Sequence, residues 1–254
     1  TAGFMFDGTT RLHKNDQRIH HMSKLACFAE EAIVPDTSCV IVPDDVPMAQ
    51  AALIGCCVTT GIGATIHTTK VVPGSTVAVI GCGGVGLSAI NGAALAGAGR
   101  VIAVDMMASK LEMAKTFGAT DVIDASQSDA VEAVKELTDG GVQYSFEAIG
   151  LKATAEQAFR MLRPGGAATI IGMIPAGVKI ELTGSAFLQE KKIQGSMMGS
   201  NRFRVDMPRF VDFYLDGKLH LDEMVSKRIG LSEVNSAFDD MKAGTVARSV
   251  IVFD

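Results

Sequence analysis

The sequence has few cysteines, little excess charge and no recognisable secretion signal. Its five cysteines are an odd and sparse set among 254 residues, and two of them, Cys56 and Cys57, are neighbours that cannot form an ordinary disulfide. Such usage is typical of a reducing compartment and argues against a disulfide scaffold. The opening residues, TAGFMFDGTTRLHKNDQ, lack the charged and then apolar layout of a signal peptide. We therefore expect a cytoplasmic protein.

Charge and hydropathy argue against two classes of partner. The net charge is −5, so the chain offers no basic surface for a nucleic-acid backbone or an anionic membrane. No apolar run is expected to reach the roughly 20 residues that cross a bilayer. With 48% hydrophobic residues and 27 glycines, the chain can bury a full core with closely packed elements. The expectation is a soluble protein with no nucleic-acid and no membrane partner.

A regular alternation of strands and helices begins at Ser75. Short β-branched apolar runs predict buried strands, and the segments between them have helical spacing. The predicted strands are STVAVIG, VIAVD, DVIDA, VQYSFEAIG, AATIIG and KKIQGSM. Thr154, followed three residues later by Gln157, predicts a capping box at the start of one helix. This alternation predicts an α/β fold with a doubly wound parallel sheet.

The flanks of this region have a different pattern. LACFAEEAIVP and CVIVP predict short strands interrupted by prolines. Near the C-terminus we expect a helix around residues 210–215, an amphipathic helix behind Ser232 and a closing strand, SVIVFD. These end segments are expected to pack together as a second domain into which the parallel sheet is inserted.

The predicted domain bounds follow from this arrangement. Residues 1–57 form an incomplete first part of the flanking domain, residues 58–198 the parallel sheet, and residues 199–254 the return segment. The chain starts with Thr1 rather than Met, and its opening residues have the composition of a loop. We therefore expect a fragment of a longer protein.

A glycine motif follows the first predicted strand. The spacing Gly81-x-Gly83-x-x-Gly86 stands directly between strand and helix. Such glycines allow a tight turn, a close approach of the backbone to a pyrophosphate, and close packing of helix on sheet. The pyrophosphate is then held at the helix N-terminus. Asp105 ends the next strand 19 positions after Gly86, near the roughly 20 expected for the acid that binds ribose hydroxyls.

The residues after Asp105 bear on the choice of cofactor. Met106 and Met107 follow it, so no arginine is available there for a 2′-phosphate, and NAD is favoured over NADP. Lys110 is either a ribose contact or a solvated helix residue. The alternative for the whole motif is a purely structural strand–helix turn with a solvated acid.

Taken together, the motifs resemble the zinc-dependent medium-chain alcohol dehydrogenases. The segments that carry the resemblance are LIGCCVTTGIGA, VVPGSTVAVIGCGGVGLSAI, RVIAVD, FGATDVID, GGVQYSFEAIG and AGTVARSVIVF. The resemblance extends from about Cys27 to the end of the chain. It implies a Rossmann sheet inserted into a partial GroES-like, mainly β catalytic domain. It also implies hydride transfer between a small alcohol or aldehyde and NAD(H).

The resemblance implies that Cys56 is a ligand of a catalytic zinc. Alcohol dehydrogenases hold that zinc with two cysteines and one histidine, and the fourth position takes water or substrate. In the family the other two ligands lie upstream of the position of Thr1, so we expect this chain alone to bind nucleotide without dehydrogenase turnover. The alternative for Cys56 is a buried free thiol, and Cys57 is expected to be a packing residue. The histidines of the N-terminal loop have no zinc spacing and are interpreted as solvated: His13, His20 and His21.

The resemblance also assigns cofactor contacts to other residues. It places Thr60 near the nicotinamide ring, and it pairs Arg248 with the pyrophosphate. Met22 is a candidate for the substrate pocket. Further cofactor contacts are implied for Gly84, Val85, Ala148, Ile149, Gly150, Ile171, Gly172, Met173, Ser196 and Met198. Without the resemblance, each of these residues has an equally good interpretation as a core or surface position.

Three other functions remain open from the sequence. An S-adenosylmethionine-dependent methyltransferase also has a glycine turn after its first strand and an acid after its second. A zinc-free reductase of the same superfamily and a non-catalytic NAD(H)-binding module are closer alternatives. The resemblance further implies a homodimer or homotetramer formed through the last strand of the sheet.

Overall fold

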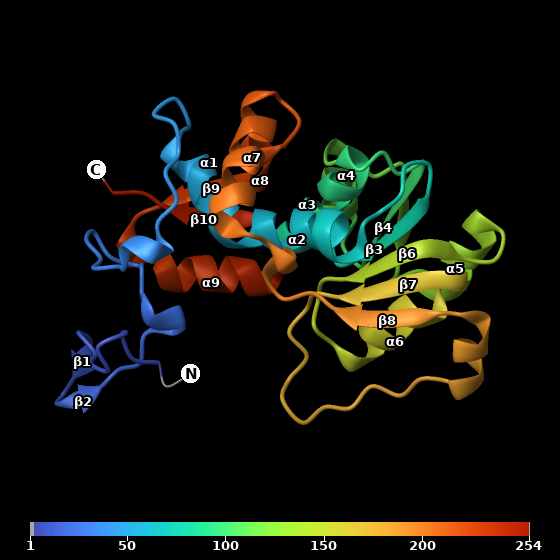
Figure 1. Ribbon diagram of the computed structural model, residues 1–254, viewed down its shortest axis with the longest axis horizontal. Helices are drawn as coiled ribbons and strands as arrows, with labels where there is room; N and C mark the ends of the chain where they lie inside the picture. The colour runs from blue at the N-terminus through green and yellow to red at the C-terminus, as the bar shows by residue number, and fades with distance from the viewer. Residues whose placement is uncertain (1–2, 254) are drawn as a thin grey trace.

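Residues 3–253 are described by a computed structural model, and a six-stranded parallel sheet lies at their centre (Figure 1). In spatial order its strands are β5 (Asp121–Asp124), β4 (Arg100–Asp105), β3 (Thr76–Ile80), β6 (Val142–Glu147), β7 (Leu162–Ile170) and β8 (Lys192–Gly195). The chain runs outward from β3 to β5, then returns to the other side of β3 and runs outward again. The carboxyl ends of β3 and β6 therefore form a switch point, where open α/β sheets bind ligands. The predicted doubly wound sheet is confirmed.

Helices cover both faces of the sheet. In strand β3, Val77 and Val79 belong to one core cluster, whereas Ala78 and Ile80 belong to the other. This alternation arises because successive side chains of a strand point to opposite faces. The first cluster includes residues of α3 (Gly84–Leu95) and α4 (Ala108–Thr116), and the second includes residues of α5 (Ala130–Thr138) and α6 (Lys152–Arg160).

The start of α6 differs from the expected capping box. The helix begins at Lys152, so Thr154 lies inside its first turn. The Thr154 hydroxyl donates to Glu147 Oε1 at 2.7 Å and also contacts the carbonyl of Leu151 at 3.0 Å. The prediction of a capping box with Gln157 is therefore wrong, because a buried carboxylate from the preceding strand takes the hydroxyl instead.

The flanking segments lie to one side of the sheet (Figure 1). The closing strand is β10 (Arg248–Ile251), and it pairs in parallel with β9 (Val225–Ile229). The amphipathic helix is α9 (Val234–Ala243), and the helix predicted around residue 210 is longer than expected, as α7 (Phe203–Leu215). A short helix, α8 (Leu221–Met224), precedes β9.

The predicted strands at residues 25–35 and 39–43 are not strands in the described chain. The N-terminal region contains instead a small hairpin of β1 (His13–Lys14) and β2 (Gln17–Arg18). The two predicted strands fail for two reasons. Proline lacks the N–H group that hydrogen bonds between strands require. In addition, no strand within residues 3–253 pairs with either segment. Short 3₁₀ turns occur at η1 (Met22–Lys24), η2 (Asp36–Ser38), η5 (Gly184–Gln189), η6 (Met198–Ser200) and η7 (Leu231–Glu233).

A continuous helix of 22 residues, Met48–Thr69, connects the flanking part to the sheet. It alternates between α and π geometry, as α1 (Met48–Leu53), η3 (Ile54–Val58), α2 (Thr59–Gly63) and η4 (Ala64–Thr69). By length and composition it could cross a membrane, which corrects the expectation that no apolar run is long enough. In this fold 72% of its most apolar window is buried, as in the core helix of a globular protein. The predicted boundary at residues 57 and 58 falls inside this helix.

Phe146 tests the packing of the sheet on α3. Its ring is fully buried on the central strand β6. We expect Phe146→Ala to lower the free energy of unfolding by about 3–5 kcal/mol, because the change leaves a cavity. Phe6→Ala, at a ring that is 67% exposed, is expected to change it by about 0.5 kcal/mol or less. Urea denaturation measures both changes, and equal losses in the two variants would contradict the described core.

Candidate functional site

The glycine turn after β3 is closed toward the sheet and open on its outer side. Gly81 has a φ of +94°, a conformation that favours glycine. A methyl group on Gly86 would collide with the carbonyl oxygen of Gly81, so the helix starts in direct contact with the turn. At Gly83, by contrast, a Cβ would meet no heavy atom within 4 Å. The turn therefore leaves space for a ligand to approach the backbone at Gly83.

Arg248 lies at the N-terminus of α3. A Cβ on Gly84 would lie 2.7 Å from the Arg248 Nε, so the guanidinium rests directly against the first helical residue. Gly83 provides no side-chain cap, which leaves the first N–H groups of the helix, including that of Val85, open to a ligand. The partial positive charge of a helix N-terminus and a guanidinium at the same point favour an anion.

The carboxylate of Asp105 is fixed beside the same turn. Its Oδ2 accepts the backbone N–H of Cys82 at 2.8 Å, and its Oδ1 accepts those of Met106 at 2.8 Å and Met107 at 3.1 Å. These bonds join the end of β4 to the loop after β3. Because each carboxylate oxygen has two lone pairs, Oδ2 can still accept one more hydrogen bond.

Lys110 extends toward the C-terminal end of α9. A Cβ on Gly244, which ends that helix with a φ of +72°, would lie 3.1 Å from Lys110 Nζ. A cation near a helix C-terminus is favourable because the dipole is negative there. This contact brings the flanking part against the loop after β4, and the ribose contact of Lys110 stays a prediction.

Glu147 is a buried residue that the sequence interpretation missed. Its side chain is 0% exposed, and its Oε1 accepts the backbone N–H groups of Ile149 at 2.9 Å and Gly150 at 2.7 Å. The loop after β6, from Ala148 to Gly150, is therefore held by the last residue of its own strand. Gly172 lies so close that a Cβ there would be 2.6 Å from Glu147 Oε2. An acid directly before the AIG segment was the available signal, but it was interpreted as part of a strand.

The residues assigned to the nicotinamide end come together from distant segments. The hydroxyl of Thr60 lies 3.7 Å from the sulfur of Met198. Ser196, after β8, shares a hydrogen bond of 2.8 Å with Thr68 on the long helix. A Cβ on Gly150 would lie 2.7 Å from the carbonyl oxygen of Met173, so the stretch of Ile171 to Met173 borders the loop after β6.

The two adjacent cysteines lie in different surroundings. Cys57 is buried, its thiol contacts the carbonyl of Leu53 at 3.3 Å, and burial raises the pKa of this thiol. The expectation that Cys57 is a packing residue is confirmed. Cys56 is exposed and lines a cavity of about 530 Å³ that Arg248 also lines. The alternative of a buried free thiol at Cys56 is therefore wrong.

The cavity is a mainly apolar groove between the long helix, α9 and β10. Partly exposed side chains of α9, Phe238 and Met241, form one wall. Cys27 lines the groove as well, but within residues 3–253 no three His, Cys, Asp or Glu side chains are grouped closely enough to hold a metal. A catalytic zinc needs three protein ligands. The described residues alone therefore do not form a zinc site.

The N-terminal histidines do not all behave as expected. His13 and His20 are exposed, as predicted. His21 is buried, and both of its ring nitrogens are engaged: Nε2 accepts the Arg11 N–H at 3.2 Å, and Nδ1 lies 3.1 Å from the Leu25 carbonyl. The interpretation of His21 as solvated is wrong, because these backbone contacts draw the ring inside the N-terminal loop. Met22 is strongly exposed and is not among the residues that line the groove.

Comparison with known proteins identifies a family whose model includes the start of α3, the helix that follows the glycine turn. The family model described as zinc-binding dehydrogenase matches residues 84–215, from the start of α3 to the end of α7. The chain belongs to the zinc-binding dehydrogenase family. This membership favours a dehydrogenase over the methyltransferase alternative.

Individual relatives of this zinc-binding dehydrogenase chain cover almost all of it. It is 39% identical over 251 residues to "Probable S-(hydroxymethyl)glutathione dehydrogenase 1" of Schizosaccharomyces pombe, with 98% of this chain and 66% of the relative covered. The crystal structure of benzyl alcohol dehydrogenase from Acinetobacter calcoaceticus matches with a TM-score of 0.93 and 33% identity, over 99% of this chain and 68% of that one. A zinc-binding dehydrogenase from Sinorhizobium meliloti 1021, bound to NADP, matches with a TM-score of 0.77 and 29% identity, over 84% and 61%. The chain thus spans about two thirds of the length of these relatives.

Thiol labelling tests the placement of the cysteines in this dehydrogenase chain. We expect iodoacetamide to modify Cys56 in the folded protein while Cys57 and Cys82 stay unmodified, because burial raises the pKa of both protected thiols.

Peptide mass spectrometry locates the modified positions. The exposed Cys27 and Cys39 serve as positive controls, and all five cysteines should react once the chain is unfolded in urea. Labelling of Cys57 in the folded state as fast as that of Cys56 would contradict the described geometry.

Proposed function

We propose that this chain binds NAD(H) and forms the cofactor-binding part of an alcohol dehydrogenase. The observation that carries the proposal is the arrangement at the carboxyl edge of the sheet, where an open glycine turn, the guanidinium of Arg248 and the carboxylate of Asp105 meet. The turn and the guanidinium suit a pyrophosphate, and the carboxylate suits ribose hydroxyls. This donor set matches the polar groups of an adenine dinucleotide.

Asp105 favours NAD over NADP in this proposal. A carboxylate accepts hydrogen bonds from the 2′- and 3′-hydroxyls of ribose but repels a 2′-phosphate. The structure from Sinorhizobium is bound to NADP, so the preference for NAD is proposed for this chain from its own residues. Here the residue after Asp105 is the exposed Met106, which offers no charge to a phosphate.

The proposed reaction is the reversible oxidation of a small alcohol to an aldehyde. When bound, NAD⁺ would accept the hydride that the carbinol carbon gives up, and the hydroxyl proton would be released. The two relatives named for their substrates act, by those names, on benzyl alcohol and on S-(hydroxymethyl)glutathione. Both compounds carry a primary –CH₂OH group, so we propose a primary alcohol as the substrate class.

Cys56 is proposed as one ligand of the zinc that characterises the family. Its exposed thiol lies in the same groove as Arg248, next to the cofactor turn. The described residues supply no cluster of further ligands, and one cysteine is not enough to hold a zinc ion. The roles of this chain's own residues are to bind the dinucleotide and to wall the groove with apolar side chains.

Asp105→Ala is the direct test of the proposal. We expect the unchanged chain to bind NADH more tightly than NADPH. The variant should bind NADH at least tenfold more weakly, a loss of about 1.4 kcal/mol, and should discriminate less between the two cofactors. Titration followed by NADH fluorescence measures the affinities, and thermal unfolding reports any loss of the Asp105 bond to Cys82.

Asp124→Ala is the matched control. Asp124 ends the neighbouring strand β5 and pairs with Asp105 in the sheet register, but it lies one strand further from the turn. The affinity of the Asp124→Ala variant for NADH should equal that of the unchanged chain. Failure of the unchanged chain to bind NADH, or its preference for S-adenosylmethionine, would overturn the proposed function.

A further inference from the structure

The segment after β8 forms a strained turn against the long helix. Three consecutive residues have positive φ: Met198 at +49°, Gly199 at +69° and Ser200 at +53°. Two of them are not glycine, and a side-chain-bearing residue keeps such a strained conformation only where the surrounding structure holds it. Backbone strain of this kind is concentrated at functional sites. The turn contains Met198, one of the residues assigned to the nicotinamide end.

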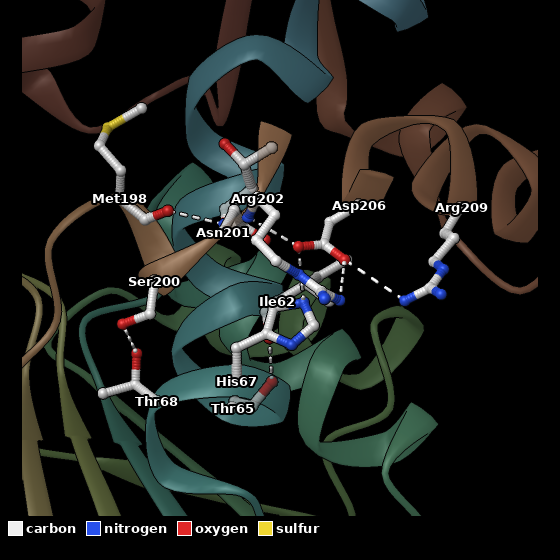
Figure 2. Close-up of polar contacts among 11 residues, drawn as sticks. Ile62, Thr65, His67, Thr68, Met198, Ser200, Asn201, Arg202, Asp206 and Arg209 are labelled. Atoms are coloured by element: carbon white, nitrogen blue, oxygen red, sulfur yellow. Dashed lines mark hydrogen bonds and ion pairs between the residues drawn. The ribbon is translucent and has the colours of Figure 1, made fainter. Parts of the chain in front are cut away.

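The side-chain amide of Asn201 joins this turn to the helix (Figure 2). Asn201 Nδ2 donates to the carbonyl of Thr59 at 2.7 Å and to the carbonyl of Met198 at 2.6 Å. Because both partners are acceptors, a side-chain NH₂ is required and a carboxylate could not replace it. Thr59 directly precedes Thr60 in the chain. The amide therefore joins the two segments that carry Thr60 and Met198.

The turn at Gly199 packs directly against the long helix, with no space for an added side-chain atom. A Cβ on Gly199 would collide with the carbonyl oxygen of Thr59 and lie 2.8 Å from the Cα of Gly63. On the other side of the turn, the hydroxyls of Ser200 and Thr68 share a hydrogen bond of 2.8 Å (Figure 2). The turn is thus fixed by bonds at both of its ends.

Asp206 anchors the residues that follow. Its carboxylate is 1% exposed, accepts the backbone N–H of Arg202 at 2.7 Å, and lies 3.7 Å from His67 Nε2 and 3.4 Å from Arg209 Nη1 (Figure 2). Burial by itself would raise the pKa of Asp206, but the Arg202 N–H and the neighbouring cationic groups lower it overall. A carboxylate held ionised here fixes the start of α7 and thereby the position of Asn201.

We propose that Asn201 is a positioning residue for the nicotinamide end of the cofactor site. This inference rests on the proposed function. The amide sets the distance between the backbone at Met198 and the helix at Thr60, so that both can meet the same ring. The side chain acts through its two carbonyl partners and makes no contact with the reacting atoms.

The test compares NADH with ADP-ribose, which lacks the nicotinamide ring. In Asn201→Ala and Asn201→Asp we expect the preference for NADH over ADP-ribose to fall about tenfold, because two partly buried carbonyls lose their donor. The affinity for ADP-ribose should change less than about twofold, since Asp105 and the glycine turn are untouched. The shift in NADH fluorescence on binding, which reports the surroundings of the ring, should also diminish.

Asn91→Ala is the matched control. Asn91 is a buried amide that also bridges to distant backbone, donating to the Lys218 carbonyl at 3.2 Å and accepting the His220 N–H at 3.3 Å. We expect this variant to lower the melting temperature and to leave the preference for NADH over ADP-ribose unchanged.

Thr68→Val keeps the test decisive if the Asn201 variants fail to fold. It removes the hydroxyl that bonds to both Ser196 and Ser200, and it should lower the NADH preference severalfold. The role of Asn201 would be overturned if the variants bound NADH and ADP-ribose equally more weakly. It would also be overturned if every folded variant kept the unchanged chain's preference for NADH over ADP-ribose. Failure of the unchanged chain to bind either ligand would instead overturn the proposed function.

Discussion

Two glycine contacts hold the candidate site, one at each end. At each contact two backbones lie so close that the glycine has room for a hydrogen atom but not for a Cβ. At the glycine turn after β3, Gly86 meets the carbonyl oxygen of Gly81, which brings the start of α3 directly onto the turn. At the other end, Gly199 packs against Gly63 and the neighbouring helix backbone. Protein interiors are close-packed, so even one added carbon at such a contact must move a whole element. Helix α2 lies between these points, because its Gly61 packs against Ala89 of α3 and its Gly63 packs against Gly199.

Three carboxylates fix the loops that border this framework. Asp105 holds the glycine turn, Glu147 holds the loop after β6, and Asp206 holds the start of α7, each by accepting backbone N–H groups. Hydrogen bonds to an ionised acceptor are shorter and stronger than neutral ones. These bonds fix the loops without a ligand, and such preorganisation lowers the entropic cost of binding one.

Arg248 connects the cofactor turn to the groove that contains Cys56. Its guanidinium rests on Gly84, while the same side chain lines the cavity next to the exposed thiol. Arg248 belongs to β10, near the C-terminus of the chain, whereas Cys56 belongs to the long helix Met48–Thr69, in the first quarter of the chain. A guanidinium and an exposed thiol therefore line the same groove, which is the arrangement that the roles proposed for Arg248 and Cys56 require.

Local patterns in the sequence determined the parallel sheet, the glycine turn and Asp105, because each depends on neighbours within one strand–turn–helix unit. The features that were missed depend on distant partners. The carbonyl that Asn201 binds lies 142 residues away, and Thr154 leaves its expected cap because Glu147 is buried beside it. The predicted strands at residues 25–35 found no partner within the described chain. Spacing along a chain specifies what a segment can become, whereas burial and pairing across the fold decide which of its polar groups are satisfied and by what.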